Sequence, residues 1–208
     1  MSVTIECKAD GPYLVKGLDK VTNSKGEEIA TESTVALCRC GGSANKPFCD
    51  GTHKRNGFSG ARLSDGADDK VVTYRAAGIT ISDNRSICAH AGYCTDGLPA
   101  TFREDAQPWI DPAGADALAI AALVTRCPSG ALNSSIDGGE AVVESGPPRV
   151  AIEKDGPYAV RGAVELLSAA WAQGAAKDRY TLCRCGASKN KPFCDGSHWD
   201  RGFKDERN

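Results

Sequence analysis

Short apolar runs near both ends of the chain are typical of β-strands. Val3-Thr-Ile-Glu6 and Arg149-Val-Ala-Ile152 are rich in β-forming residues, and each leads into the turn sequence Asp-Gly-Pro-Tyr. Two further runs, Val35-Ala-Leu37 and Tyr180-Thr-Leu182, directly precede the sequence Cys-Arg-Cys. We therefore expect four strands, the second pair of which delivers two closely spaced cysteines.

Helical patterns are fewer. Residues Asp116 to Thr125 read DALAIAALVT, an Ala- and Leu-rich segment that predicts the best-defined helix of the chain. Residues 164–173 (VELLSAAWAQ) also look helical, although their repeat counterpart, residues 19–28, reads as a hairpin. Asp50 and Asp195, each followed by glycine, are expected to cap short helices.

The chain contains an internal repeat with a constant offset of 145 residues. Segments 38–58 and 183–203 are identical at 15 of 21 positions, and Asp10-Gly-Pro-Tyr13 returns as Asp155-Gly-Pro-Tyr158. Because the spacing inside each copy is kept, the repeat indicates two whole structural units of about 55 to 60 residues and not two short motifs.

The repeat divides the chain into three modules: module A (1–62), a middle module (63–148) and module A′ (149–208). Loop-like segments at 64–69 and 145–148 bound the middle module. Units this small bury little apolar surface, and two copies on one tether meet at a high effective concentration. We therefore predict an α+β protein in which two small β-rich modules form an intramolecular pseudo-dimer with an inserted α+β module.

Composition narrows the class of protein. The chain has 208 residues, of which 41% are hydrophobic and 25% charged, as in a globular protein. A net charge of −2 argues against broad nucleic-acid binding. No apolar stretch is long enough for a membrane span, and residues 1–10 do not resemble a signal peptide. The expected compartment is the cytoplasm.

Ten cysteines in such a protein suggest metal ligands and not disulfides. Nine of them form three groups of three, and only Cys7 stands apart, as a residue expected to behave as a small buried hydrophobe. Each outer module combines three cysteines with a histidine four residues after the third. These four donors suit either a tetrahedral zinc ion or a binuclear iron–sulfur cluster, and the single residue between the first two cysteines favours the cluster.

The segments Cys-Arg-Cys-Gly…Lys-Pro-Phe-Cys-Asp-Gly-[Thr/Ser]-His resemble the CDGSH, or mitoNEET-type, iron–sulfur domain. The pentapeptide is literal at 194–198, and the copy at 49–53 differs only at Thr52. The resemblance implies a [2Fe–2S] cluster in each module and a strand-exchanged pairing of the two. It implies these ligands: Cys38, Cys40, Cys49 and His53 at site A, and Cys183, Cys185, Cys194 and His198 at site A′.

The middle module carries a third cysteine group. Cys88 and Cys94, followed later by Cys127-Pro128, match a bacterial ferredoxin run in which the second ligand position is occupied by Ala91. Residues 72–137 resemble the divergent mono-cluster ferredoxin domain that occurs beside CDGSH modules. Three cysteines suit a [3Fe–4S] cluster; the alternatives are a [4Fe–4S] cluster completed by His90 or solvent, and an empty site.

These sites predict an electron carrier. Replacing a thiolate by imidazole should raise the cluster potential, and protonation of the imidazole can compete with iron. The same property favours a second function, that of a cluster donor or a redox or pH sensor, and a zinc-stapled interaction module is a third. No enzyme motif is present. The expected partner is a redox protein or an apo iron–sulfur acceptor, and the chain is expected to be a monomer that binds neither nucleic acid nor membrane.

Overall fold

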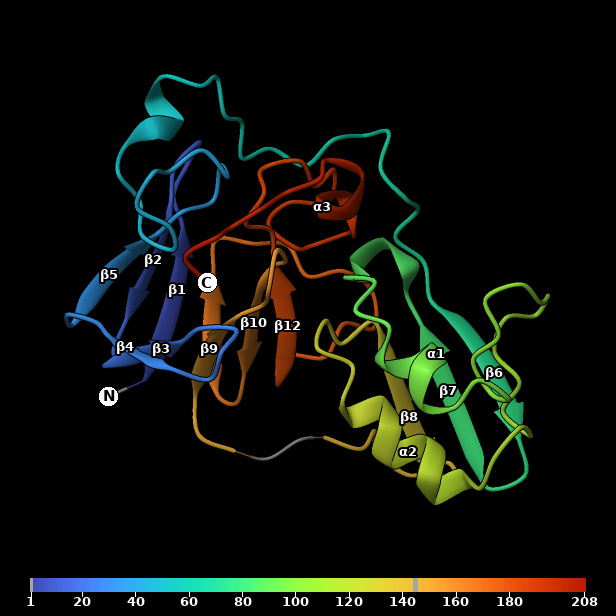
Figure 1. Cartoon of the computed structure of the whole chain (residues 1–208). Helices are drawn as coiled ribbons and strands as arrows, with labels where there is room; N and C mark the ends of the chain where they lie inside the picture. Colours follow the sequence, from blue (N-terminus) through green and yellow to red (C-terminus); the bar gives the residue numbers. More distant parts are fainter. Residues whose placement is uncertain (1, 144–145) are drawn as a thin grey trace.

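A computed structural model describes residues 2–143 and 146–208 of the chain. It is a mixed α+β protein in which short strands predominate (Figure 1). The two repeats form two sheets that lie side by side, and the middle module lies beside the second of them (Figure 1). Ser145, at the start of the predicted second linker, lies outside the described residues.

The first sheet has the order β11-β1-β2-β5 and the second the order β12-β10-β9-β3-β4. The strands of module A are β1 (Val3–Cys7), β2 (Tyr13–Lys16), β3 (Lys20–Thr22), β4 (Glu28–Ala30) and β5 (Thr34–Leu37). Those of module A′ are β9 (Arg149–Ile152), β10 (Tyr158–Arg161), β11 (Val164–Leu167) and β12 (Arg179–Leu182). The strands predicted before each Cys-Arg-Cys and at each module's start are all present.

The two repeats exchange one strand each. β11 of module A′ pairs in parallel with β1 of module A, and β3 of module A pairs in parallel with β9 of module A′. At the repeat offset, β3 and β11 are equivalent strands. Neither sheet is therefore complete without the other half of the chain.

The exchange corrects the helix predicted for residues 164–173. Val164–Leu167 is strand β11, in which Val164 and Leu166 are buried and Glu165 is exposed. This alternation is the period of a strand with one face in the core. Ser168 then takes a left-handed φ of 61°, which ends the strand, and no helix follows up to residue 173. The hairpin expected from the other repeat, at 19–28, is formed by β3 and β4.

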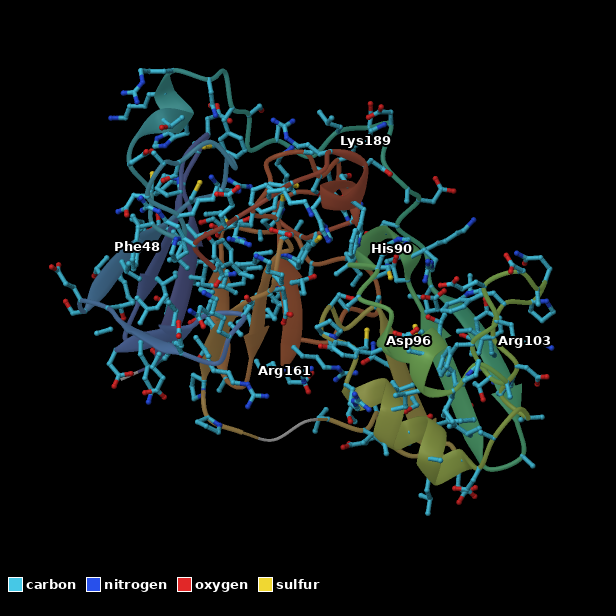
Figure 2. The ribbon with its side chains drawn as sticks, in the orientation of Figure 1. Phe48, His90, Asp96, Arg103, Arg161 and Lys189 are labelled. Carbon is cyan, nitrogen blue, oxygen red and sulfur yellow. The ribbon has the colours of Figure 1, made fainter. Side chains whose placement is uncertain are left out.

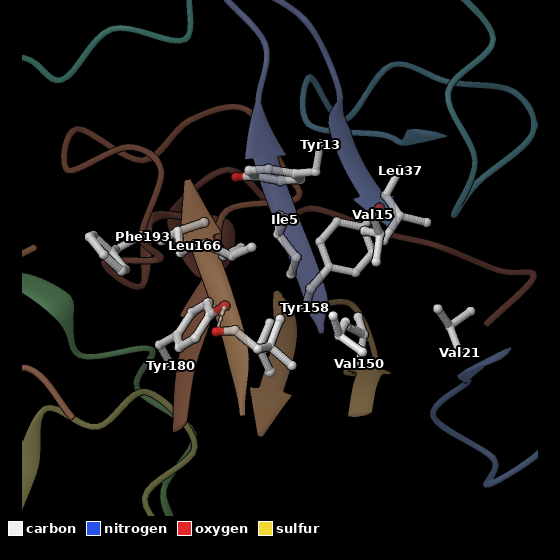
Figure 3. Close-up of a cluster of buried hydrophobic side chains, with 14 of the residues drawn as sticks. Ile5, Tyr13, Val15, Val21, Leu37, Val150, Tyr158, Leu166, Tyr180 and Phe193 are labelled. Carbon is white, nitrogen blue, oxygen red and sulfur yellow. Dashed lines mark hydrogen bonds between the residues drawn. The ribbon is translucent and has the colours of Figure 1, made fainter. Parts of the chain in front are cut away.

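A single hydrophobic core joins the two sheets. Figure 3 shows side chains from both repeats, among them Ile5, Val15, Val150 and Leu166, meeting in one cluster. Tyr13 and Tyr158 are fully buried there, and their rings pack edge to face with centroids 6.0 Å apart. The two repeats thus share one interior.

The middle module has its own sheet and core. Its antiparallel strands, in the order β6-β7-β8, are β6 (Val72–Ala76), β7 (Ile79–Asp83) and β8 (Leu132–Ile136). Helix α2 (Ala117–Thr125) packs on this sheet through buried Ile120 and Val124, as the Ala/Leu-rich pattern predicted, and its first turn is capped by Asp116. The shorter helical segments are η1 (Thr52–Lys54), η2 (Arg85–Ile87), α1 (Tyr93–Gly97) and α3 (Ser197–Asp200). No helix in the described part of the chain is long and apolar enough to cross a membrane.

Candidate metal centres

Site A brings its four predicted residues together as two pairs. Cys38 and Cys40 follow β5, and their Sγ atoms lie 3.9 Å apart. The Sγ of Cys49 lies 3.3 Å from Nδ1 of His53, which belongs to η1. Each pair is close enough to bind one metal ion through both of its donor atoms.

Site A′ repeats this geometry after β12. The Sγ atoms of Cys183 and Cys185 are 3.9 Å apart, and Cys194 Sγ is 3.4 Å from Nδ1 of His198 on α3. Within the described residues no three such side chains converge on a single ion position. A donor set made of two separate soft pairs fits a binuclear iron–sulfur group.

Asp50 and Asp195 directly follow the third cysteine of each site and stabilise the loop that carries the ligands. Asp50 Oδ1 accepts a hydrogen bond from the N–H of Thr52, and its Oδ2 accepts one from the N–H of Ala44. These hydrogen bonds, led by those from Thr52, hold the pKa of Asp50 well below its usual range. Asp195 makes the equivalent bonds to Ser197 and Lys189. The N-cap residue of each short helix is the glycine after the aspartate, Gly51 or Gly196. Each aspartate therefore lies one position before the cap that the sequence predicted it to be.

The ligand loops of the two outer sites lie directly against each other. Tyr13 donates its hydroxyl to the carbonyl of Cys183 at 2.9 Å, and Tyr158 donates to the carbonyl of Cys38 at 2.9 Å. Gly41, at φ 75°, leaves no room for a side chain, because a Cβ there would lie 2.4 Å from the carbonyl oxygen of Cys185. Sequence reasoning treated the tyrosines only as turn markers, although their identity in both repeats was the signal that could have revealed this contact.

Three thiols of the outer sites have a raised pKa, whereas the contact with Cys183 lowers the pKa of Cys185. Burial raises the pKa of Cys38 to about 11 and raises that of Cys194 well above its usual value. The pKa of Cys183 is also raised, first by its contact with Cys185 and then by burial. Because the thiolate is the metal-binding form, loading these sites must release protons.

The middle site is a cavity of about 520 Å³ whose lining includes all three predicted cysteines, Cys88, Cys94 and Cys127. Ala91, at the ferredoxin ligand position that lacks a cysteine, also lines it, as does His90. Burial raises the pKa of Cys88 to about 11 and also raises that of Cys94. A cavity lined by three sulfur donors fits a compact inorganic cluster.

Two further residues lie near the outer sites or the shared core: Cys7, expected from the sequence to be a buried hydrophobe, and Trp199. Cys7 ends β1 and packs against the shared core, only partly buried. The Trp199 ring lies on the His198 ring, with centroids 5.3 Å apart, and is 64% exposed.

Comparison with known proteins covers all three sites. A family model described as iron-binding zinc finger CDGSH type matches residues 10–54 and 155–199, and one described as divergent 4Fe-4S mono-cluster matches residues 74–136. Uncharacterized protein YjdI of Escherichia coli K12 is 36% identical over 59 residues, which make up 28% of this chain and 78% of that protein. YjdI of E. coli O157:H7 matches to the same extent. The ranges matched by the two models contain every predicted ligand.

Proposed function

Because the chain belongs to the CDGSH-type iron-binding family and carries a divergent 4Fe–4S mono-cluster domain, it is an iron–sulfur protein, and we propose that it transfers electrons. We assign one [2Fe–2S] cluster to site A and one to site A′. Such a cluster, when bound, accepts and gives up one electron. The observation that carries this assignment is the division of each site's donors into a Cys–Cys pair and a Cys–His pair.

The protein's own groups would tune these sites. The N–H of Gly42 donates to Cys40 Sγ at 3.4 Å, and that of Ala187 donates to Cys185 Sγ at 3.4 Å. Hydrogen bonds to ligand sulfurs stabilise negative charge and so raise the reduction potential. The imidazoles of His53 and His198 would act in the same direction, because each replaces an anionic thiolate.

We further propose that modules A and A′ act as an intramolecular pseudo-dimer. The exchange of β3 and β11 and the reciprocal tyrosine contacts support this arrangement. It would place both outer sites on one rigid body, so that a single chain replaces a dimer of two identical subunits.

In the middle module we propose a [3Fe–4S] cluster held by Cys88, Cys94 and Cys127. The cavity supports a cluster at this place, and Ala91 supports three cysteine ligands. His90 stays the alternative donor for a fourth iron, since it also lines the cavity. The ferredoxin-like character of the module belongs to this proposal.

The proposed setting is that of a non-enzymatic, cytoplasmic carrier. Its partner would be another redox protein, and the chain would act as a monomer. One observation favours a second function: His53 is partly exposed. This second function would be donation of a cluster to an apo-protein, or sensing through a labile histidine ligand.

Iron and acid-labile sulfide on the anaerobically purified protein, read with its visible spectrum, test the proposal. We expect about seven irons per chain if the middle site holds [3Fe–4S], and about four if it is empty. Transfer of a cluster to an apo-ferredoxin would favour the donor function, whereas reversible redox cycling without loss of iron would favour the carrier. Stoichiometric zinc without sulfide would contradict both.

A further inference from the structure

The two outer sites have the same ligand types but differ in burial. Cys194 and His198 are 3% and 5% exposed, whereas Cys49 and His53 are both partly exposed. The repeats match closely in sequence here, so the difference must come from what lies against each site.

On one side of site A′, a side chain of module A′ donates a hydrogen bond to the middle module. Asn190 Nδ2 donates to the carbonyl of Ser86 at 2.6 Å, and Asn190 is 2% exposed. Its repeat counterpart, Asn45, is exposed, and its Oδ1 accepts a hydrogen bond from Arg207 Nη1 at 3.2 Å. Beside it, the N–H of Leu63 donates to the carbonyl of Lys189 at 2.8 Å.

His90 covers the histidine corner of site A′. A Cβ on Gly196 would lie 2.6 Å from Cδ2 of His90, so the imidazole sits directly on the glycine of the CDGSH pentapeptide. At the equivalent Gly51 a Cβ would meet nothing within 4 Å. Figure 2 shows His90 on the middle module (green) at its junction with the C-terminal segment that carries α3. His90 adopts a left-handed φ of 53°, a conformation uncommon for a residue with a side chain.

An aromatic contact within module A′ also packs against the loop of site A′. The Trp171 ring packs on Phe193, with centroids 5.4 Å apart, and Phe193 is 2% exposed. At the repeat offset Trp171 corresponds to Gly26, which has no ring to pack on Phe48, and Phe48 is only partly buried.

From this asymmetry we infer that the middle module seals site A′, and that site A is the outer site that presents its histidine corner to partner proteins. His90 and Ser86 act as positioning residues of the seal. The inference rests on the proposed function, because it assumes that both sites are loaded. The two sites have the same ligand types but different roles. Site A exchanges electrons with partner proteins, whereas site A′, which lies between site A and the middle site, retains its cluster.

The test compares the release of the two sites within one chain. The oxidised, iron-loaded protein is incubated with EDTA, sampled over time and alkylated with iodoacetamide, and the peptides containing Cys49 and Cys194 are quantified by mass spectrometry. Removal of the metal transfers no electrons, because ferric iron passes to EDTA, sulfide leaves protonated, and the cysteine thiolates take protons from water. We expect Cys49 to become labelled at least about tenfold faster than Cys194, a ratio equivalent to about 1.4 kcal/mol.

Two variants test whether contacts with the middle module cause the difference in labelling rate between Cys49 and Cys194. Asn190→Ala and His90→Gly should each speed labelling of Cys194 several-fold and leave that of Cys49 unchanged; glycine accepts the left-handed φ of His90 without strain. The matched control Asn45→Ala should change neither rate. Equal labelling of the two sites, faster labelling of Cys194, or no response to either variant overturns the inference alone. Protein that contains no iron and sulfide overturns the proposed function, and the inference with it.

Discussion

At the scale of single residues, the histidines have the largest expected effect on chemistry. His53 and His198 each stand within 3.4 Å of a cysteine sulfur, and the CDGSH resemblance implies that both are cluster ligands. Burial lowers the pKa of His198, which favours the neutral, metal-binding form of its imidazole. The ligand spacing could be read from the sequence because it is local. The contact of His90 with Gly196 could not, because it joins residues more than a hundred positions apart.

Replacing the histidines should lower the reduction potential. His53→Cys and His198→Cys each add an anionic thiolate, and all-cysteine plant-type clusters lie near −400 mV, below the range of two-histidine Rieske centres. We expect the potential of the altered site to fall by on the order of 100 mV. Redox titration followed by visible absorbance measures this, and an unchanged potential in both variants would argue against histidine ligation.

A carboxylate in the middle module makes stability depend on pH. Burial raises the pKa of Asp83 to about 6, and one of its oxygens accepts a hydrogen bond from Trp109 Nε1 at 3.1 Å. The folded state therefore binds a proton more tightly than the unfolded state, so this contribution to stability is present at low pH and is lost as the pH rises through 6.

Asp83→Asn removes this titration and keeps an acceptor for Trp109. Relative to the wild type, the variant should gain up to about 3 kcal/mol in unfolding free energy between pH 4 and pH 8. Denaturant titrations of both proteins at each pH measure the difference, in which effects of acid on the metal sites cancel. A difference that does not vary with pH would show that Asp83 is not the group responsible.

At the scale of elements, the sequence predicted the strands that lead to cysteines and the helix after Asp116, because propensity and pattern agree there. It failed at 164–173, where helix-forming residues sit in a segment whose place is decided by pairing with β1. The hairpin pattern of the repeat counterpart, residues 19–28, was the better predictor, because equivalent residues of the two repeats occupy equivalent positions in the two sheets. Tertiary pairing outweighed local propensity.

The Asp-Gly-Pro-Tyr turns connect each repeat to the metal loop of the other. Tyr158→Phe leaves the carbonyls of Cys38 and Pro47 without their hydroxyl donor in a buried place. Tyr13→Phe does the same to Cys183 and Pro192. The two proline carbonyls keep a backbone N–H donor, whereas the carbonyl of Cys38 or Cys183 loses its hydroxyl donor. Each variant should therefore lose about 1–3 kcal/mol of stability, as expected for one buried group left unpaired. Chemical denaturation checks this, and a loss well below that range in both would mean the contacts are not formed in solution.

At the scale of the whole molecule, the repeat predicted three modules, and β3 and β11 each pair with a strand of the other outer module. The difference in burial between the two sites could not be foreseen, since it depends on how the middle module docks. Ser86 and Asn190 belong to no sequence motif from which their hydrogen bond could be predicted. A chain with two nearly identical metal motifs thus presents them to the solvent unequally.

Separating the repeats should abolish the folded monomer. A fragment of residues 1–62 lacks β11, and its β3 lacks β9. We expect this fragment to be unfolded or to pair with a second copy, and co-expression with residues 149–208 to restore a compact, coloured complex. Light scattering and circular dichroism measure the outcome. A folded, monomeric 1–62 fragment would contradict the role given to the exchanged strands.

The central claim is that each outer site binds a binuclear cluster through three cysteines and one histidine. Pulsed electron paramagnetic resonance of the reduced protein tests it most directly, because a nitrogen bound to iron couples to the electron spin. We predict a strong nitrogen coupling in the wild type that disappears when both His53→Cys and His198→Cys are introduced. A [2Fe–2S] signal without such a coupling in the wild type, or a [2Fe–2S] signal that keeps the coupling in the double variant, would contradict the account.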